Sequence, residues 1–119
     1  MKENVILEKS FEFAVRIVNL YKYLANEKKE YVLSKQMLRC GTSIVANLSE
    51  SQDAISKKDF LAKVYISLKE CRETETWLKL LYRTDYLNQA QYESIISDCL
   101  EILRILTSIA KSTKNKIDK

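Results

Sequence analysis

Residues 57–111 read KKDFLAKVYISLKECRETETWLKLLYRTDYLNQAQYESIISDCLEILRILTSIAK, and this stretch decides the fold. Its apolar residues recur three or four positions apart, which is the spacing of one face of an α-helix. The pattern is interrupted only at TDYLN, residues 84–88. Because so short a connection keeps consecutive helices side by side, the two helical segments must be antiparallel neighbours in a bundle.

The composition favours helices along the rest of the chain. The 119 residues include one glycine and no proline, the two residues on which turns most often depend. We therefore predict an all-α fold in which one domain, residues 1–119, forms an antiparallel up-down-up-down four-helix bundle. The predicted helices span about 10–28, 35–52, 57–83 and 89–111, and residues 112–119 form a frayed tail.

Serine and asparagine mark the predicted helix starts, because their side chains can accept hydrogen bonds from the free N–H groups of a first turn. Ser10, Ser34, Ser56 and Asn88 hold these positions. Asp59 lies three residues after Ser56, in the register of a capping box.

The first two helices carry apolar stripes that we expect to face the core. In the first helix the stripe consists of Phe11, Ala14, Val15, Val18 and Tyr21, and it is widened by Ile17, Leu20 and Leu24. The stripe of the second helix includes Gly41, which no turn residues surround. A glycine inside a helix costs about 1 kcal/mol relative to alanine, so Gly41 predicts a close approach of another helix.

The last predicted helix has more apolar surface than one core requires. At about 100° per residue its apolar arc covers roughly 220°, whereas a helix facing one core needs little more than about 100°. The helix either lies centrally, with neighbours on both sides, or uses part of the arc as a subunit interface. The candidate interface residues are Ile96, Leu100, Leu103 and Ile105.

The composition also argues against several classes of site. The chain has no histidine, the commonest general base and the commonest neutral metal ligand. Cys40, Cys71 and Cys99 lack the CxxC spacing and lie in apolar patterns, so we expect buried thiols in a reducing cytoplasm. We predict no metal, no cofactor and no small-molecule substrate.

Nothing in the sequence predicts a membrane protein. No apolar run approaches the roughly 20 residues that span a bilayer, and the first residues lack the apolar core of a signal peptide. We therefore expect a cytoplasmic protein without membrane contact.

A line of polar residues borders the apolar stripe of the second helix. The line consists of Gln36, Arg39, Ser43, Asn47 and Glu50. The third helix is antiparallel to the second, so a turn near residues 53–54 places Ser43 near Tyr65. The same register places Arg39 near Glu70 and Glu73.

The cluster of Arg39, Glu70 and Glu73 has two interpretations. It can be an ion-pair network that fixes the helix register, or the two carboxylates can act as a general acid and base. A guanidinium beside both carboxylates favours their ionised forms, which suits an ion pair better than a proton donor. We therefore predict a structural network and no catalytic residue.

The lysines offer a candidate contact with nucleic acid. The net charge is +4, and the bundle topology gathers lysines at the end where the first and third helices start. The candidate contacts are Lys9, Lys57, Lys58, Lys111 and Lys114. Nearby carboxylates offset much of their charge in one copy. A ring of copies would repeat the patch, and affinity for phosphates grows steeply with the number of contacts.

Two motifs carry a family resemblance. Residues 36–50, QMLRCGTSIVANLSE, fit the pattern Q-x-x-R-x-x-x-S-I-x-x-N-x-x-E, and residues 69–78, KECRETETWL, provide the second motif. Both resemble the four-helix-bundle proteins encoded in intervening sequences of bacterial 23S rRNA genes, also described as a ribosomal protein family. The likeness extends from about Phe11 to Lys111. Family members often have N-I-A-E-G where this chain has NLSES at residues 47–51.

The resemblance implies a four-helix bundle in which the polar line and the two glutamates are part of the architecture. Members of the family are similar to pentamer-forming proteins, so a homo-oligomer, and specifically a pentamer, is expected. A related branch is the accessory variability protein of diversity-generating retroelements, which is a basic pentameric barrel that binds nucleic acid and a reverse transcriptase. The resemblance implies no established enzymatic activity.

Three functions follow from these features. The first is a non-enzymatic, self-assembling bundle that binds RNA or DNA as an oligomer. The alternative is a protein–protein interaction module without nucleic-acid contact. The most remote is an enzyme that uses Glu70, Glu73 and Arg39.

Overall fold

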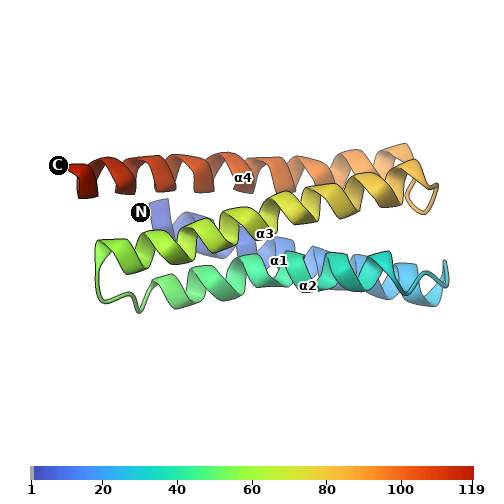
Figure 1. Ribbon diagram of the computed structural model, residues 1–119. Coiled ribbons are helices and arrows are strands. Elements are labelled where there is room, and N and C mark those ends of the chain that lie inside the picture. Colours follow the sequence, from blue (N-terminus) through green and yellow to red (C-terminus); the bar gives the residue numbers. More distant parts are fainter. Residues whose placement is uncertain (1) are drawn as a thin grey trace.

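The computed structural model describes residues 2–119, with side chains from residue 5 onward. In this part of the chain there are four helices and no strand: α1 (Lys2–Asn26), α2 (Leu33–Ser51), α3 (Lys57–Arg83) and α4 (Gln89–Asp118). Consecutive helices run in opposite directions, and both termini lie at the same end of the bundle (Figure 1). Each helix packs against its two neighbours, α1 and α4 included. The predicted all-α four-helix bundle is confirmed.

The starts of α3 and α4 agree with the sequence prediction. The Ser56 hydroxyl accepts a hydrogen bond from the backbone N–H of Asp59, at 3.0 Å. The Asn88 side chain accepts one from the N–H of Gln91 at 2.8 Å, and the Gln91 side chain accepts one from the N–H of Asn88 at 2.9 Å. These side chains satisfy N–H groups that the first helical turn leaves without an intrahelical partner.

Two predicted boundaries are wrong. Helix α1 begins at Lys2 instead of near residue 10, and Ser10 lies buried inside it without a hydrogen-bond partner for its hydroxyl. The predicted tail 112–119 continues α4 as far as Asp118. Ile6 near one terminus is buried and Ile117 near the other is half-buried, so apolar packing extends both helices beyond the predicted limits.

The start of α2 is capped by a residue that was not predicted from the sequence. It starts at Leu33, before Ser34, and the Glu30 carboxylate accepts hydrogen bonds from the N–H groups of Val32, Leu33 and Ser34 at 3.1, 3.0 and 2.7 Å. Burial by itself would raise the pKa of Glu30, but these hydrogen bonds outweigh it and lower the pKa below its ordinary value. A carboxylate also interacts favourably with the positive end of the helix dipole.

The core face of α1 differs from the predicted stripe. The buried apolar residues of α1 are Ile6, Phe13, Ala14, Ile17 and Leu24. Phe11 and Val15, which we expected in the core, are 63% and 47% exposed. Helix α1 carries two apolar stripes at helical spacing, and periodicity alone does not identify the stripe that faces the other helices.

Two packing features agree with the sequence. A Cβ atom at Gly41 would lie 2.9 Å from Cγ2 of Ile17, so glycine permits the close approach of α1 and α2. All three cysteines are buried and free, and the sulfur atoms of Cys71 and Cys99 lie 3.8 Å apart between α3 and α4. The thiols behave as small apolar groups in the core.

Candidate functional site

Arg39 of the polar line joins α2 to α3. Its Nη1 lies 3.3 Å from Oε2 of Glu70, and its Nη2 lies 3.3 Å from Oε2 of Glu73. The hydrogen bond to Glu73, together with the charges of both glutamates, raises the pKa of Arg39 above its usual range. Arg39 is 53% exposed and Glu70 is 12% exposed, so the cluster lies at the edge of the helix contact.

Other members of the line do not join this cluster. The Ser43 hydroxyl donates to the carbonyl of Arg39, and the Asn47 amide donates to the carbonyl of Ser43, both within α2. Glu50 forms a separate ion pair with Lys63 at 2.9 Å. Gln36 is exposed. The line therefore consists of two ion-pair groups and two local hydrogen bonds.

The register of α2 and α3 differs from the predicted one by about one helical turn. We expected Ser43 opposite Tyr65, but the buried Ser67 hydroxyl of α3 donates to the carbonyl of Ile44, at 3.0 Å. The predicted turn lay near residues 53–54, and the unwound segment between Ser51 and Lys57 has nearly the same centre. The position of the turn therefore does not account for the shift.

A second set of ion pairs joins α1 to α4. Arg16 Nη1 lies 2.6 Å from Oδ2 of Asp98, and Lys9 Nζ lies 3.3 Å from Oε1 of Glu101. Lys9, a predicted nucleic-acid contact, is therefore already paired. Neither pair was predicted, because each joins helices at opposite ends of the chain.

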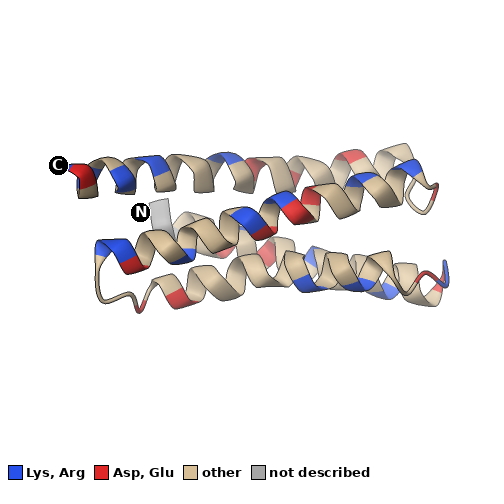
Figure 2. Cartoon of the chain, viewed as in Figure 1, with Lys and Arg blue, Asp and Glu red and all other residues tan. Residues whose placement is uncertain are grey.

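The remaining predicted contacts with nucleic acid lie together. Figure 2 shows basic residues on α3 and α4 at the end of the bundle that carries both termini. Lys57, Lys58, Lys111 and Lys114 are exposed there, and none of them forms an ion pair within residues 5–119. We call these four residues the lysine end.

The apolar arc of α4 is mostly used inside the bundle. Ile95, Cys99, Ile102, Leu106 and Ile109 are buried. The four candidate interface residues are half-buried, and three of them pack against the core: Ile96, Leu103 and Ile105. No large apolar side chain of α4 is among the exposed ones in the described chain. A subunit contact through α4 stays a prediction.

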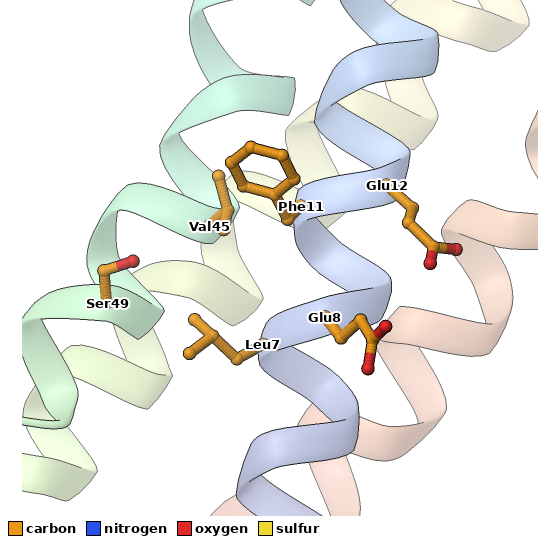
Figure 3. A pocket seen from close by; sticks show the side chains of 6 residues that line it. All are labelled: Leu7, Glu8, Phe11, Glu12, Val45 and Ser49. Atoms are coloured by element: carbon orange, nitrogen blue, oxygen red, sulfur yellow. The ribbon is translucent and has the colours of Figure 1, made fainter.

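The more exposed apolar surface lies between α1 and α2. Figure 3 shows Phe11 and Leu7 of α1 beside Val45 and Ser49 of α2, around a shallow hollow. A second hollow continues along α1 and shares Phe11 with the first. We call this surface the neutral face, and its residues are Leu7, Phe11, Val15, Val18, Val45 and Ser49.

One feature of the sequence could have predicted the neutral face. Helix α2 has no charged residue between Arg39 and Glu50. A solvent-facing helix usually carries charged residues every few positions, whereas the centres of protein interfaces are depleted of charge. This uncharged run is the sequence signal that corresponds to the neutral face.

No metal or membrane site emerges from the described chain. Its acidic and cysteine side chains form no group of three that could hold a metal ion. Within residues 2–119 no helix is long and apolar enough to cross a bilayer. The neutral face, the Arg39 cluster and the lysine end are three exposed features of the described chain.

These features define a helical bundle whose recognisable sites are surfaces and ion pairs. A family model described as "23S rRNA-intervening sequence protein" matches residues 2–108. The chain belongs to this family.

A solved structure from Bacteroides thetaiotaomicron is similar to the chain along nearly its whole length. That protein is described as one of unknown function from the S23 ribosomal protein family. It is 59% identical, with a TM-score of 0.92, and the match covers 93% of this chain and 99% of the other. A comparison with curated proteins finds no match. The comparisons thus define the family and the fold.

Proposed function

We propose that this protein is a non-catalytic subunit that assembles with copies of itself in the cytoplasm. The observation that carries the proposal is the neutral face, where Phe11 is 63% exposed in an apolar surface that has Glu8 and Glu12 at its border. An apolar surface of this kind is unfavourable in water and is stabilised when a partner covers it. The resemblance to pentamer-forming proteins sets five as the expected number of subunits.

The Arg39 cluster supports a structural role over a catalytic one. Glu70 and Glu73 both pair with the Arg39 guanidinium across the contact of the two helices, each at 3.3 Å. The cluster therefore suits a device that aligns α2 with α3.

The mass in solution tests the proposal. Light scattering coupled to size exclusion, at protein concentrations from about 1 to about 100 μM, measures it across the range of ordinary subunit affinities. We expect a mass that is a multiple of the 13.9 kDa chain. A mass of 13.9 kDa at every concentration would contradict self-assembly.

The lysine end favours a second function, in which the assembled protein binds RNA or DNA. Its four lysines are exposed and form no ion pair within residues 5–119. Each copy in an assembly would add such a patch, and affinity would then depend steeply on salt because bound lysines release counterions. The alternative is an assembly that contacts only proteins.

Binding of a structured RNA at about 50 and about 200 mM salt tests this second function. We expect binding that weakens at least about tenfold with salt and is lost when the four lysines become glutamine. The matched control neutralises lysines at or near the opposite end of the bundle: Lys22, Lys28, Lys29 and Lys35. Absent binding, or equal loss in the control, would exclude the lysine end.

A further inference from the structure

We infer that the assembly is head to tail, with the neutral face of one copy seated on the outer side of α3 of the next copy. This inference rests on the proposed self-assembly and identifies the two surfaces that meet. It follows from exposed apolar groups, unpaired charges and the positions of the two surfaces on the bundle.

The outer side of α3 also exposes apolar surface. A shallow hollow there is lined by Tyr65, Leu68, Lys69, Arg72, Glu73 and Thr76. Tyr65 is 44% exposed, and a tyrosine gives a large apolar contact with a polar end. We call this surface the α3 face. Phe11 of one copy and Tyr65 of the next would provide the aromatic centre of the contact.

The two surfaces carry opposite charges at their edges. Glu8 and Glu12 border the neutral face, and in Figure 3 both point away from Phe11 and Val45. Lys69 and Arg72 border the α3 face. None of these four residues forms an ion pair within residues 5–119.

The spacing of these charges also matches. Glu8 and Glu12 are four positions apart on α1, and Lys69 and Arg72 are three apart on α3. Residues at either spacing are neighbours on a helix surface, with Cβ atoms about 5–6 Å apart. Two acidic groups can therefore face two basic groups across one helix–helix contact. Such complementarity favours this pairing over others.

The alternative of a two-fold dimer through the neutral face is less favourable. It would bring Glu8 and Glu12 of one copy beside Glu8 and Glu12 of the other, and like charges at an interface oppose association. The same carboxylates oppose an anionic partner such as a nucleic acid or an acidic lipid surface at this face. A second copy that presents Lys69 and Arg72 brings positive charges to Glu8 and Glu12, so neither repulsion arises.

The two surfaces cannot meet within one molecule. Helices α1 and α3 are diagonal in the bundle and make no direct backbone contact in the described chain. Each copy therefore offers one surface of each kind on different sides. A contact between unlike surfaces repeats from copy to copy, and it gives a closed ring when the rotation closes.

Charge reversal on each surface tests the inference. Variant A carries Glu8→Lys and Glu12→Lys, and variant B carries Lys69→Glu and Arg72→Glu. Each variant alone would place like charges across the contact, so we expect its association to weaken at least about tenfold at low salt. Mixing A with B restores opposite charges at each A–B contact, so we expect complexes of A with B to form. A ring of five would still contain at least one A–A or B–B contact, so the recovered complexes need not reach the full size of the unchanged assembly.

The controls reverse the same number of charges away from both surfaces. Glu27→Lys with Asp53→Lys matches variant A, and Lys28→Glu with Lys35→Glu matches variant B. Circular dichroism establishes that all four proteins are folded, and light scattering gives their masses. We expect the controls to keep the mass of the unchanged protein.

The outcomes separate the inference from the proposed function. If the unchanged protein assembles and variants A and B assemble equally well, another surface is used and the inference is overturned. Loss of assembly in A and B without recovery on mixing would also overturn the head-to-tail contact. If the unchanged protein is a monomer, self-assembly itself is contradicted.

Discussion

Helices α1 and α4 both carry more apolar side chains than one side of a bundle core needs, but the bundle uses the surplus differently. In α4 the surplus is half-buried, and most of it packs against the core. In α1 the surplus includes Phe11 and Val15, which are exposed. The width of an apolar arc therefore does not locate an interface, because neighbouring helices can cover part of it.

The largest expected effect is that of a substitution at a buried residue of α4. Ile102 of α4 is 1% exposed, so Ile102→Ala should lower the free energy of unfolding by about 2–5 kcal/mol. Phe11→Ala should lower the stability of the monomer by less than about 1 kcal/mol. It should also remove any dependence of Tm on protein concentration, since assembly stabilises the folded subunit.

Urea unfolding measures the free energies, and thermal unfolding at several protein concentrations measures the dependence of Tm on concentration. Similar losses for the two variants at the lowest concentration would mean that Phe11 belongs to the core. The surplus apolar residues of α1 would then be covered like those of α4, and the difference between the two helices would not exist.

A smaller effect is expected where α1 meets α2 beneath the neutral face. In Gly41→Ala the new Cβ would contact the stiff, β-branched Ile17 at 2.9 Å, and forced overpacking costs about 1–3 kcal/mol. The gain in helix propensity offsets about 1 kcal/mol of this. We expect a net loss of about 1 kcal/mol in thermal or urea unfolding.

Ala46→Gly at an exposed position of α2 is the control, because it changes helix propensity alone. If Gly41→Ala stabilises the protein by as much as Ala46→Gly destabilises it, the helices are not in close contact there.

The Glu30 cap at the start of α2 should make the free energy of unfolding depend on pH. Because the folded-state pKa of Glu30 is lowered, its charge stabilises the fold above the unfolded-state pKa, and this contribution is lost as the pH falls through the folded-state pKa. Glu30→Gln should cost about 1 kcal/mol at pH 7, and the difference should shrink below about pH 4. Urea unfolding as a function of pH measures it.

Glu27→Gln, an exposed change in the same loop, should have no effect. A Glu30→Gln difference that stays constant from pH 7 to below about pH 4 would show that the charge is not responsible.

The smallest effect is expected at the Arg39 cluster. Arg39 is half exposed, so Arg39→Ala should lower Tm by less than about 5 °C, because solvent weakens exposed ion pairs. Differential scanning calorimetry measures the change. A fall of more than about 10 °C would mean that the cluster holds α2 against α3 more strongly than its exposure implies.

Helix number, direction and the starts of α3 and α4 could be predicted because they depend on local patterns. Periodicity, the short turn at residues 84–88 and the caps at Ser56 and Asn88 are all signals within a few residues. The cap by Glu30 was missed because its carboxylate reaches two to four residues forward from outside the helix.

Features that depend on tertiary packing could not be predicted in the same way. The sequence shows two apolar stripes on α1 but does not identify the one that the other helices cover. The Arg39 contacts were predicted because a short hairpin limits the register, whereas the Arg16–Asp98 pair spans 82 positions. The candidate site therefore emerged mainly from the positions of α1 and α2 in space.

Sedimentation velocity of two variants tests most directly whether the neutral face holds the assembly together. Phe11→Glu places a charge at the centre of this face, and Leu100→Ala shortens a half-buried candidate interface residue of α4. We predict that Phe11→Glu sediments as a 13.9 kDa monomer, while Leu100→Ala keeps the assembled size of the unchanged protein. An assembled Phe11→Glu variant, or a monomeric Leu100→Ala variant that remains folded, would contradict the account.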